Sequence, residues 1–282
     1  MSHLHDFVLS GRSTVQLTFP EGSILNPPIN GEYFDTVYKK NVTLINARLS
    51  EKAPTLQDQG FALFKHNLNL SEVYDNNQAE IDDSCLVDII KAHTNASDVL
   101  MLGVNSRYEG DKKSPGSIKF KPDIIVHTDW GPNRIRQISQ NPIKDRILSN
   151  NQWLAADISH FINSSARWGI VNLWLPVTTI THNNLALCDK SAVKQEDIVR
   201  SVTYLENDKG SELMSLVDNP SHRWYHFPLM ESNEGLIFTQ FDSLEGDDFI
   251  PTFHSAFNVP TPSPTSRSNR RSLEYRFFVK WT

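Results

Sequence analysis

Short runs of apolar residues, separated by Pro, Gly, Asn and Asp, recur along most of this chain. In the first hundred residues, alternation of apolar and polar positions predicts strands over Ser13–Thr18 and Asn41–Leu49, and a turn into a third strand over Gln57–Leu63. The apolar residues of Ile81–His93 follow helical spacing and include two acidic residues in the first turn, which favours a helix. Val99–Val104 then predicts a further strand.

Aromatic and β-branched residues gather in many short runs from about residue 118 onward, with one helical interval at Ile143–Ser164. We expect strands at Ile118–Phe120, Ile124–His127, Val171–Pro176, Ala186–Leu187, Trp224–Phe227, Leu236–Phe241, His254–Phe257 and Leu273–Trp281. Many short strands with turn signals between them are typical of a sandwich or barrel, and a jelly roll is one of the few ways to close them. Pro260–Asn269 is too rich in Pro and Ser for an inner strand and predicts an exposed loop or lid.

The expected fold is therefore mainly β with flanking helices, in a single domain over residues 1–282. Residues 1–115 would form an N-terminal α/β elaboration, and residues 116–282 would form the jelly-roll core. No segment between the two reads as a linker, so we do not divide the chain further.

Composition and charge narrow the class of protein. The chain carries 27 Lys and Arg against 33 Asp and Glu, a net charge of −6, which argues against a nucleic-acid partner. No apolar run approaches the ~18 residues of a membrane span, and the N-terminus lacks the pattern of a secretory signal. Cys85 and Cys188 lie too far apart for a CxxC metal pair and do not suggest a disulfide framework. We expect a cytoplasmic protein and leave open whether it forms a homodimer.

The sharpest chemical feature is His127-Thr128-Asp129 at the end of an apolar strand. Residues two apart in a strand point to the same face, so the imidazole and the carboxylate would converge. His254 from a later strand would complete a two-histidine, one-carboxylate set, which non-heme Fe(II) oxygenases use. A chain with 10 His and 33 acidic residues contains roughly one such tripeptide by chance, so the tripeptide alone is more often a structural strand end.

A second feature is the pair Arg270 and Ser272, which follows His254 and the Pro-rich loop. On a strand, the guanidinium and the hydroxyl point to one face and could grip a dicarboxylate such as 2-oxoglutarate, because Arg offers a planar bidentate fork. Arg48-Leu49-Ser50 is a second Arg-x-Ser in the chain, and a solvated basic run around Arg270 is an equally good reading of these residues alone.

The order of these pieces resembles a known family. A series of six segments resembles the AsaB-type hydroxylase/desaturase family, which includes gibberellin desaturase-like and CmcJ-type proteins. In chain order the segments are HTDW, VNLWLPV, NLALCD, HRWYHFPLMESNEGLIFTQFDS, HSAF and RRSLEYR. LQDQGFALFKH extends the resemblance into the N-terminal half. The resemblance implies a double-stranded β-helix (jelly-roll, cupin-like) core. It also implies a dioxygenase that uses Fe(II), 2-oxoglutarate and O2 to hydroxylate, desaturate or epoxidise a small secondary-metabolite-type substrate, with release of succinate and CO2.

Residue by residue, the resemblance implies a catalytic metal site made of His127, Asp129 and His254. It places the 2-oxoglutarate anchor at Arg270 with Ser272, and Arg276 on the same strand face is the alternative anchor. We also expect four residues on or near probable inner strands to contact co-substrate or substrate: Arg167, Asn172, Trp174 and Tyr225. For Trp174 and Tyr225, a place in the core or pocket wall competes with that role.

The sequence departs from the family at two positions. Leu175 stands where the family commonly has Arg, and Arg271 stands where it has an acidic residue. Both differences can alter the substrate pocket, so no relative's substrate carries over.

Two other functions fit the same metal ligands. A cupin-like hydrolase or isomerase would use a divalent ion as a Lewis acid and would need neither 2-oxoglutarate nor O2. A non-catalytic accessory subunit of a two-protein enzyme would load iron poorly without its partner. The pair of Arg270 and Ser272 argues against the hydrolase.

Overall fold

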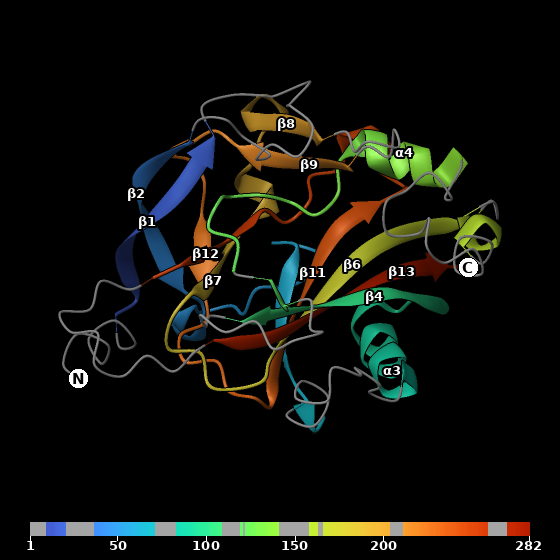
Figure 1. Cartoon of the computed structure of the whole chain (residues 1–282), viewed down its shortest axis with the longest axis horizontal. Helices are drawn as coiled ribbons and strands as arrows, with labels where there is room; N and C mark the ends of the chain where they lie inside the picture. Colours follow the sequence, from blue (N-terminus) through green and yellow to red (C-terminus); the bar gives the residue numbers. More distant parts are fainter. Residues whose placement is uncertain are drawn as a thin grey trace.

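The computed structural model of the chain describes residues 10–20, 37–70, 83–108, 119–120, 122–140, 158–162, 166–203, 211–258 and 270–282 (Figure 1). Its larger sheet has the order β3–β11–β6–β13–β4–β5, with strands at Phe61–Lys65, Glu234–Asp242, Arg167–Pro176, Arg271–Trp281, Asp98–Tyr108 and Lys119–Phe120. Its smaller sheet has the order β1–β2–β10–β7–β12, with strands at Arg12–Pro20, Val37–Asn46, Trp224–His226, Asn184–Cys188 and His254–Phe257. Strands β8 (Ile198–Thr203) and β9 (Ser211–Leu216) form a separate antiparallel ribbon.

The two sheets pack face to face. Trp174 of β6 and Phe238 of β11 share one apolar cluster with Leu185 and Leu187 of β7, so side chains from both sheets meet between them. Strands far apart in sequence alternate across this space, as Figure 1 shows for β12 and β7 on one side and β11, β6 and β13 on the other. This arrangement confirms the predicted mainly β, jelly-roll fold.

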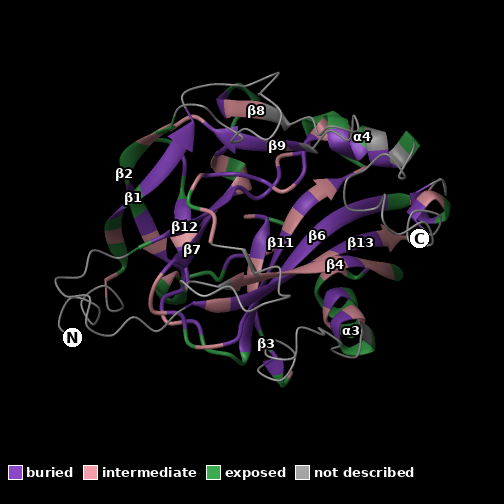
Figure 2. Cartoon of the chain, viewed as in Figure 1, coloured by how far each residue is buried: buried purple, intermediate pink, exposed green. Residues whose placement is uncertain are grey.

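The central strands β6 and β13 of the larger sheet are buried on both faces, whereas β4 is mostly half-buried (Figure 2). On β13, Leu273 and Tyr275 point outward, where they pack with Leu86 and Ile90 of helix α3 (Asp83–Thr94). Alternation then turns Ser272, Glu274 and Arg276 toward the interior. This polar row inside a barrel otherwise lined with Leu, Phe and Trp marks the side of the interior where the chemistry lies.

The other described regular elements are helices and short 3-10 turns between the strands. Helix α4 spans Pro132–Gln140, residues 158–162 are helical, and 3-10 turns lie at Ala47–Leu49, Lys190–Ala192, Gln195–Asp197 and Gly246–Asp248. Ile135 and Ile138 of α4 pack with Trp130, Trp168 and Phe278 at one end of the larger sheet. None of the helices in these described ranges is long and apolar enough to cross a membrane.

Most predicted elements are confirmed within a few residues, including the helix at Ile81–His93, which the structure describes from Asp83. The predicted strand Ile124–His127 is wrong as a regular strand, because among the described residues it forms isolated bridges, Thr18–Ile125 and His127–His254, and no continuous ladder. Helix α4 and the β8–β9 ribbon were not predicted. The predicted loop Pro260–Asn269 lies wholly outside the described residues. Most of the predicted helical interval Ile143–Ser164 lies outside them too. The proposed division at residue 115 stays a prediction.

Candidate metal centre

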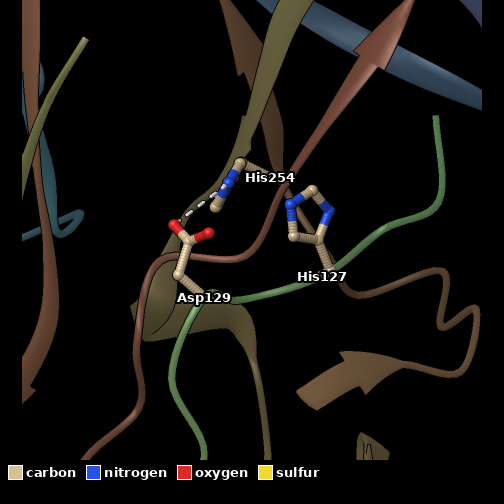
Figure 3. Close-up of side chains that lie close together, drawn as sticks. All are labelled: His127, Asp129 and His254. Atoms are coloured by element: carbon tan, nitrogen blue, oxygen red, sulfur yellow. Dashed lines mark ion pairs between the residues drawn. The ribbon is translucent and has the colours of Figure 1, made fainter. Parts of the chain in front are cut away.

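Three side chains from two separate segments converge inside the barrel (Figure 3). One ligand atom from each of His127, Asp129 and His254 lies within 4.8 Å of the others, and His254 Nε2 is 3.8 Å from Asp129 Oδ2. The backbones of His127 and His254 exchange two N–H···O bonds of 3.0 Å, which sets their rings side by side at 4.4 Å. The structure thus brings together the three residues that the sequence singled out.

Both histidines present a nitrogen lone pair to this space. His127 Nδ1 lies 2.7 Å from the carbonyl oxygen of Ile125, and His254 Nδ1 lies 3.2 Å from that of Thr252. A carbonyl oxygen only accepts, so each Nδ1 carries a proton, and in the neutral ring this leaves Nε2 as the acceptor, as in histidines that bind metals. His254 Nε2 is buried and finds no hydrogen-bond partner among the described residues. Such an atom needs a ligand.

The charges of the site suit a divalent cation. Burial opposes ionisation of Asp129, but the charges of Arg276, His254 and His127 lower the pKa of this carboxyl below its ordinary value. Burial, with a smaller contribution from His127, lowers the pKa of His254 to about 4. At neutral pH the cluster is therefore one carboxylate and a neutral His254, the protonation states in which these groups bind metal.

The segment that carries His127 and Asp129 is held by side chains and backbone of neighbouring strands. Thr128 N donates to the Met214 carbonyl of β9 (2.8 Å), and Asp129 N donates to Gln240 Oε1 of β11 (3.0 Å). Further along, Glu212 of β9 accepts hydrogen bonds from the first backbone amides of helix α4, including Asn133 N at 2.6 Å. This carboxylate caps the helix that leaves the metal segment.

We expect Gly131→Ala to destabilise the protein by about 1–2 kcal/mol, the usual value of a lost helix cap. A Cβ at Gly131 would lie 2.4 Å from Cγ and Oε2 of Glu212, so the carboxylate would have to leave the α4 amides. Urea unfolding of the metal-free protein measures the loss. Gly11→Ala is the matched control, because a Cβ there meets nothing within 4 Å. Equal unfolding free energies for the two variants would contradict the prediction.

The predicted anchor Arg270 is buried at the start of β13. Its Nε donates to Ser272 Oγ (3.2 Å), its Nη1 donates to the Asn183 carbonyl (2.6 Å), and its guanidinium carbon lies 5.1 Å above the Trp174 ring. Arg270 is only 4% exposed, so the guanidinium faces the barrel interior. The solvated basic run that the sequence allowed is therefore wrong for Arg270.

The alternative anchor Arg276 lies elsewhere in the interior. Its Nη2 donates to Asp129 Oδ1 at 2.7 Å and to Glu274 Oε1 at 2.8 Å. Asn172 Nδ2 donates to the other Asp129 oxygen, Oδ2, at 2.5 Å. Asn172 and Arg276 are thus brought to the metal centre.

Two other sequence candidates, Arg167 and Tyr225, have partners outside the triad. Arg167 forms an ion pair with Asp242 and stacks over the ring of Trp281 at 4.4 Å. Tyr225 of β10 is half-buried, with its ring 5.7 Å from that of Phe61. The second Arg-x-Ser arginine, Arg48, binds both carboxylate oxygens of Glu234, at 2.9 and 2.6 Å.

Sequence reasoning did not single out Glu274 or Gln240, which complete the surroundings of Asp129. A local signal existed for Glu274, because alternation from Ser272 to Arg276 turns it to the same face. Gln240 contacts Asp129 across 111 residues of sequence, and no local pattern indicates that contact.

Comparisons with known proteins agree with this geometry. The model of the oxidoreductase/YMDC permease-like domain family matches residues 23–280. The alpha-ketoglutarate-dependent dioxygenase tstK of Talaromyces stipitatus is 27% identical over 252 residues, which cover 84% of each chain. The hydroxylase/desaturase CTB9 of Cercospora beticola is 26% identical over 257 residues, covering 86% of this chain and 76% of that one.

Among solved structures, the iron and alpha-ketoglutarate-dependent endoperoxidase NvfI superposes with a TM-score of 0.75. It covers 96% of this chain and 98% of its own at 19% identity, which shows a shared fold. The family resemblance predicted from the sequence is confirmed by these comparisons. The chain belongs to the oxidoreductase/YMDC permease-like domain family, together with the hydroxylase/desaturase proteins that its motifs resemble.

Proposed function

We propose that this protein is an Fe(II)- and 2-oxoglutarate-dependent oxygenase that oxidises a small secondary-metabolite-type substrate. The observation that carries the proposal is the buried cluster of two histidines and one carboxylate, with His254 Nε2 facing the Asp129 oxygen. Two nitrogens and one oxygen on one side of a metal leave its other positions free, as Fe(II) oxygenases require. Relatives named as alpha-ketoglutarate-dependent dioxygenases, matched over most of this chain, support the same conclusion.

His127, Asp129 and His254 would hold the iron, and the residues around them suit that ion. When bound, Fe(II) with 2-oxoglutarate and O2 supplies the oxidation of the substrate, with release of succinate and CO2. The protein orients its reactants and excludes water from them. Phe238, whose ring lies 5.0 Å from that of His254, and the apolar cluster around it form a dry wall for that purpose.

Arg270 is the residue that we propose as the anchor of the far carboxylate of 2-oxoglutarate. Its guanidinium is buried and held over Trp174, and it donates to the neutral oxygens of Ser272 and Asn183. A carboxylate would compensate the buried positive charge better than neutral oxygens do. We propose a secondary role for Trp174 in lining this part of the site, and we leave Tyr225 and Arg167 as weaker substrate-contact proposals.

We propose a cytoplasmic protein that binds a small-molecule substrate, has no nucleic-acid or membrane partner and can form a homodimer. The net charge of −6 supports the absence of a polyanion partner.

The test is an anaerobic titration of the purified protein with Fe(II) and 2-oxoglutarate, followed in the visible spectrum. We expect a weak charge-transfer band that needs both additions and that His127→Ala abolishes. Metal binding without the band would favour a Lewis-acid hydrolase. Failure of the folded chain to bind metal would favour an accessory subunit.

We expect Arg270→Lys to raise the 2-oxoglutarate concentration at half-maximal band by about 10–100-fold. A hydrogen bond to a charged group contributes about 1.5–3 kcal/mol, and Lys cannot reproduce the bidentate fork. The same titration measures this change. Ser272→Ala, which removes one neighbour of the guanidinium but keeps the charge, should have a smaller effect. An unchanged 2-oxoglutarate affinity in Arg270→Lys would rule out Arg270 as the anchor.

A further inference from the structure

We infer that Arg276 is a positioning residue that fixes the orientation of the Asp129 carboxylate, so that this side chain offers one oxygen to the metal. In this arrangement Glu274 holds Arg276 in place, and Asn172 steadies the second Asp129 oxygen. The inference rests on the proposed function, because it assigns work to residues beside the proposed iron ligands.

The sheet places these side chains next to one another. Arg276 is the cross-strand partner of Asn172 on β6 and of Gly103 on β4, and paired residues point to the same face. The pairing of β13 with β4 shifts register directly after Arg276, and Gly103 has a φ of 150° at this irregularity. Gly103 carries no side chain, so the position on β4 opposite Arg276 leaves room for the arginine side chain.

The contacts of Arg276 are charged and buried. Its Nη2 lies 2.7 Å from Asp129 Oδ1 and 2.8 Å from Glu274 Oε1, and the three side chains are 11%, 7% and 6% exposed, respectively. The carboxamide oxygen of Asn105, in the orientation that satisfies its neighbours, accepts from both terminal nitrogens at 3.0 and 3.1 Å. A guanidinium held by three acceptors has one orientation, and it imposes that orientation on the Asp129 oxygen that it binds.

The two oxygens of Asp129 consequently have different tasks. Oδ1 is directed to Arg276, whereas Oδ2 faces His254 Nε2 at 3.8 Å and accepts from Asn172 Nδ2 at 2.5 Å. Oδ2 is therefore the oxygen on the metal side. Hydrogen bonds of this kind to a ligating carboxylate orient it and tune its affinity for metal.

Two further atoms of this group lack partners. Arg276 Nε and Asn172 Oδ1 are buried and have no hydrogen-bond partner among the described residues. A buried pair built for stability alone would satisfy these atoms, since an unpaired buried polar atom is costly. Arg276 Nη2 already donates to the carboxylates of Asp129 and Glu274. This arginine is therefore poorly suited to bind a carboxylate of 2-oxoglutarate as well.

The test separates metal affinity from co-substrate affinity by making the same substitution at two arginines. Anaerobic binding of Mn(II) without 2-oxoglutarate, followed by the EPR signal of the free ion, is measured for wild type, Arg276→Lys and Arg270→Lys. We expect Arg276→Lys to weaken Mn(II) binding by about 10–100-fold, the usual effect of losing such a partner. Arg270→Lys should bind Mn(II) as the wild type does and should lose 2-oxoglutarate affinity instead.

Wild-type Mn(II) affinity in folded Arg276→Lys would overturn the inference while leaving the proposed function intact, whether 2-oxoglutarate binding or only the melting temperature had changed. A wild-type protein that binds no Mn(II) would instead remove the proposed function, and this inference with it. If Arg276→Lys does not fold, Glu274→Gln and Asn172→Ala replace it, with circular dichroism as the check of folding. Each should weaken Mn(II) binding by about tenfold, and wild-type affinity in both would overturn the inference.

Discussion

Replacing His254 with alanine is expected to abolish metal binding and to lower succinate formation from 2-oxoglutarate by at least about 10³-fold. A bound metal supplies several kcal/mol to the reaction that it supports, and each 1.36 kcal/mol corresponds to a tenfold change in rate. His254 is 3% exposed and its Nε2 has no hydrogen-bond partner in the described part of the chain, so no other group there would take over its role.

The measurement is iron content after anaerobic loading, together with succinate formed in the presence of O2 and 2-oxoglutarate. The matched control is His226→Gln, a buried histidine of the same sheet whose ring meets Phe257 of β12 edge-on at 5.8 Å. This control should keep its iron. Full iron content in His254→Ala would show that the cluster of His127, Asp129 and His254 is not the metal site.

The second large effect is on stability: Trp224→Ala should lower the free energy of unfolding by about 3–5 kcal/mol, as truncation of buried aromatic residues does. Trp224 is 2% exposed and lies in β10, where it pairs with Leu44 of β2 on one side and Cys188 of β7 on the other. Its ring also meets Phe19 of β1 edge-on at 6.2 Å. The cavity would therefore open where β1 and β2 meet the other strands of the smaller sheet.

Urea unfolding of the metal-free protein measures this loss. Leu244→Ala, at a side chain that is 73% exposed, is the control and should change stability by less than about 0.5 kcal/mol. A change of less than about 1 kcal/mol in Trp224→Ala would show that the packing of Trp224 against β1 and β2 contributes little to stability.

The features that the sequence predicts are those that depend on the spacing of residues close together in the chain. His127 and Asp129 were expected to converge because they are two residues apart, and they do so although their segment is not a regular strand. The apolar run of His254–Phe257 marks its strand. Helix α4 was missed because its N-terminal amides are satisfied by Glu212, a residue 79 positions away from Asn133. A cap supplied by another strand leaves no local signature.

Side-chain chemistry was easier to predict than side-chain partners. Arg48 and Arg270 begin the same Arg-x-Ser pattern, yet Arg48 is exposed and binds Glu234 of β11, whereas Arg270 is buried in the interior. Arg167 has suitable chemistry to bind the carboxylate of a co-substrate, but it forms its ion pair with Asp242 instead. Which acceptor an arginine meets depends on strands paired across more than seventy residues, and alternation along one strand does not reveal it.

Strand β13 is the last strand in chain order and lies inside the larger sheet, between β4 and β6. Until it has been synthesised and inserted, β4 and β6 have no common neighbour, and Asp129 lacks the arginine that holds it. Contacts of such large sequence separation form slowly and late during folding. A chain whose β13 is not yet inserted therefore has its histidines but not its completed centre, and iron can be captured in the final geometry only after β13 has taken its place.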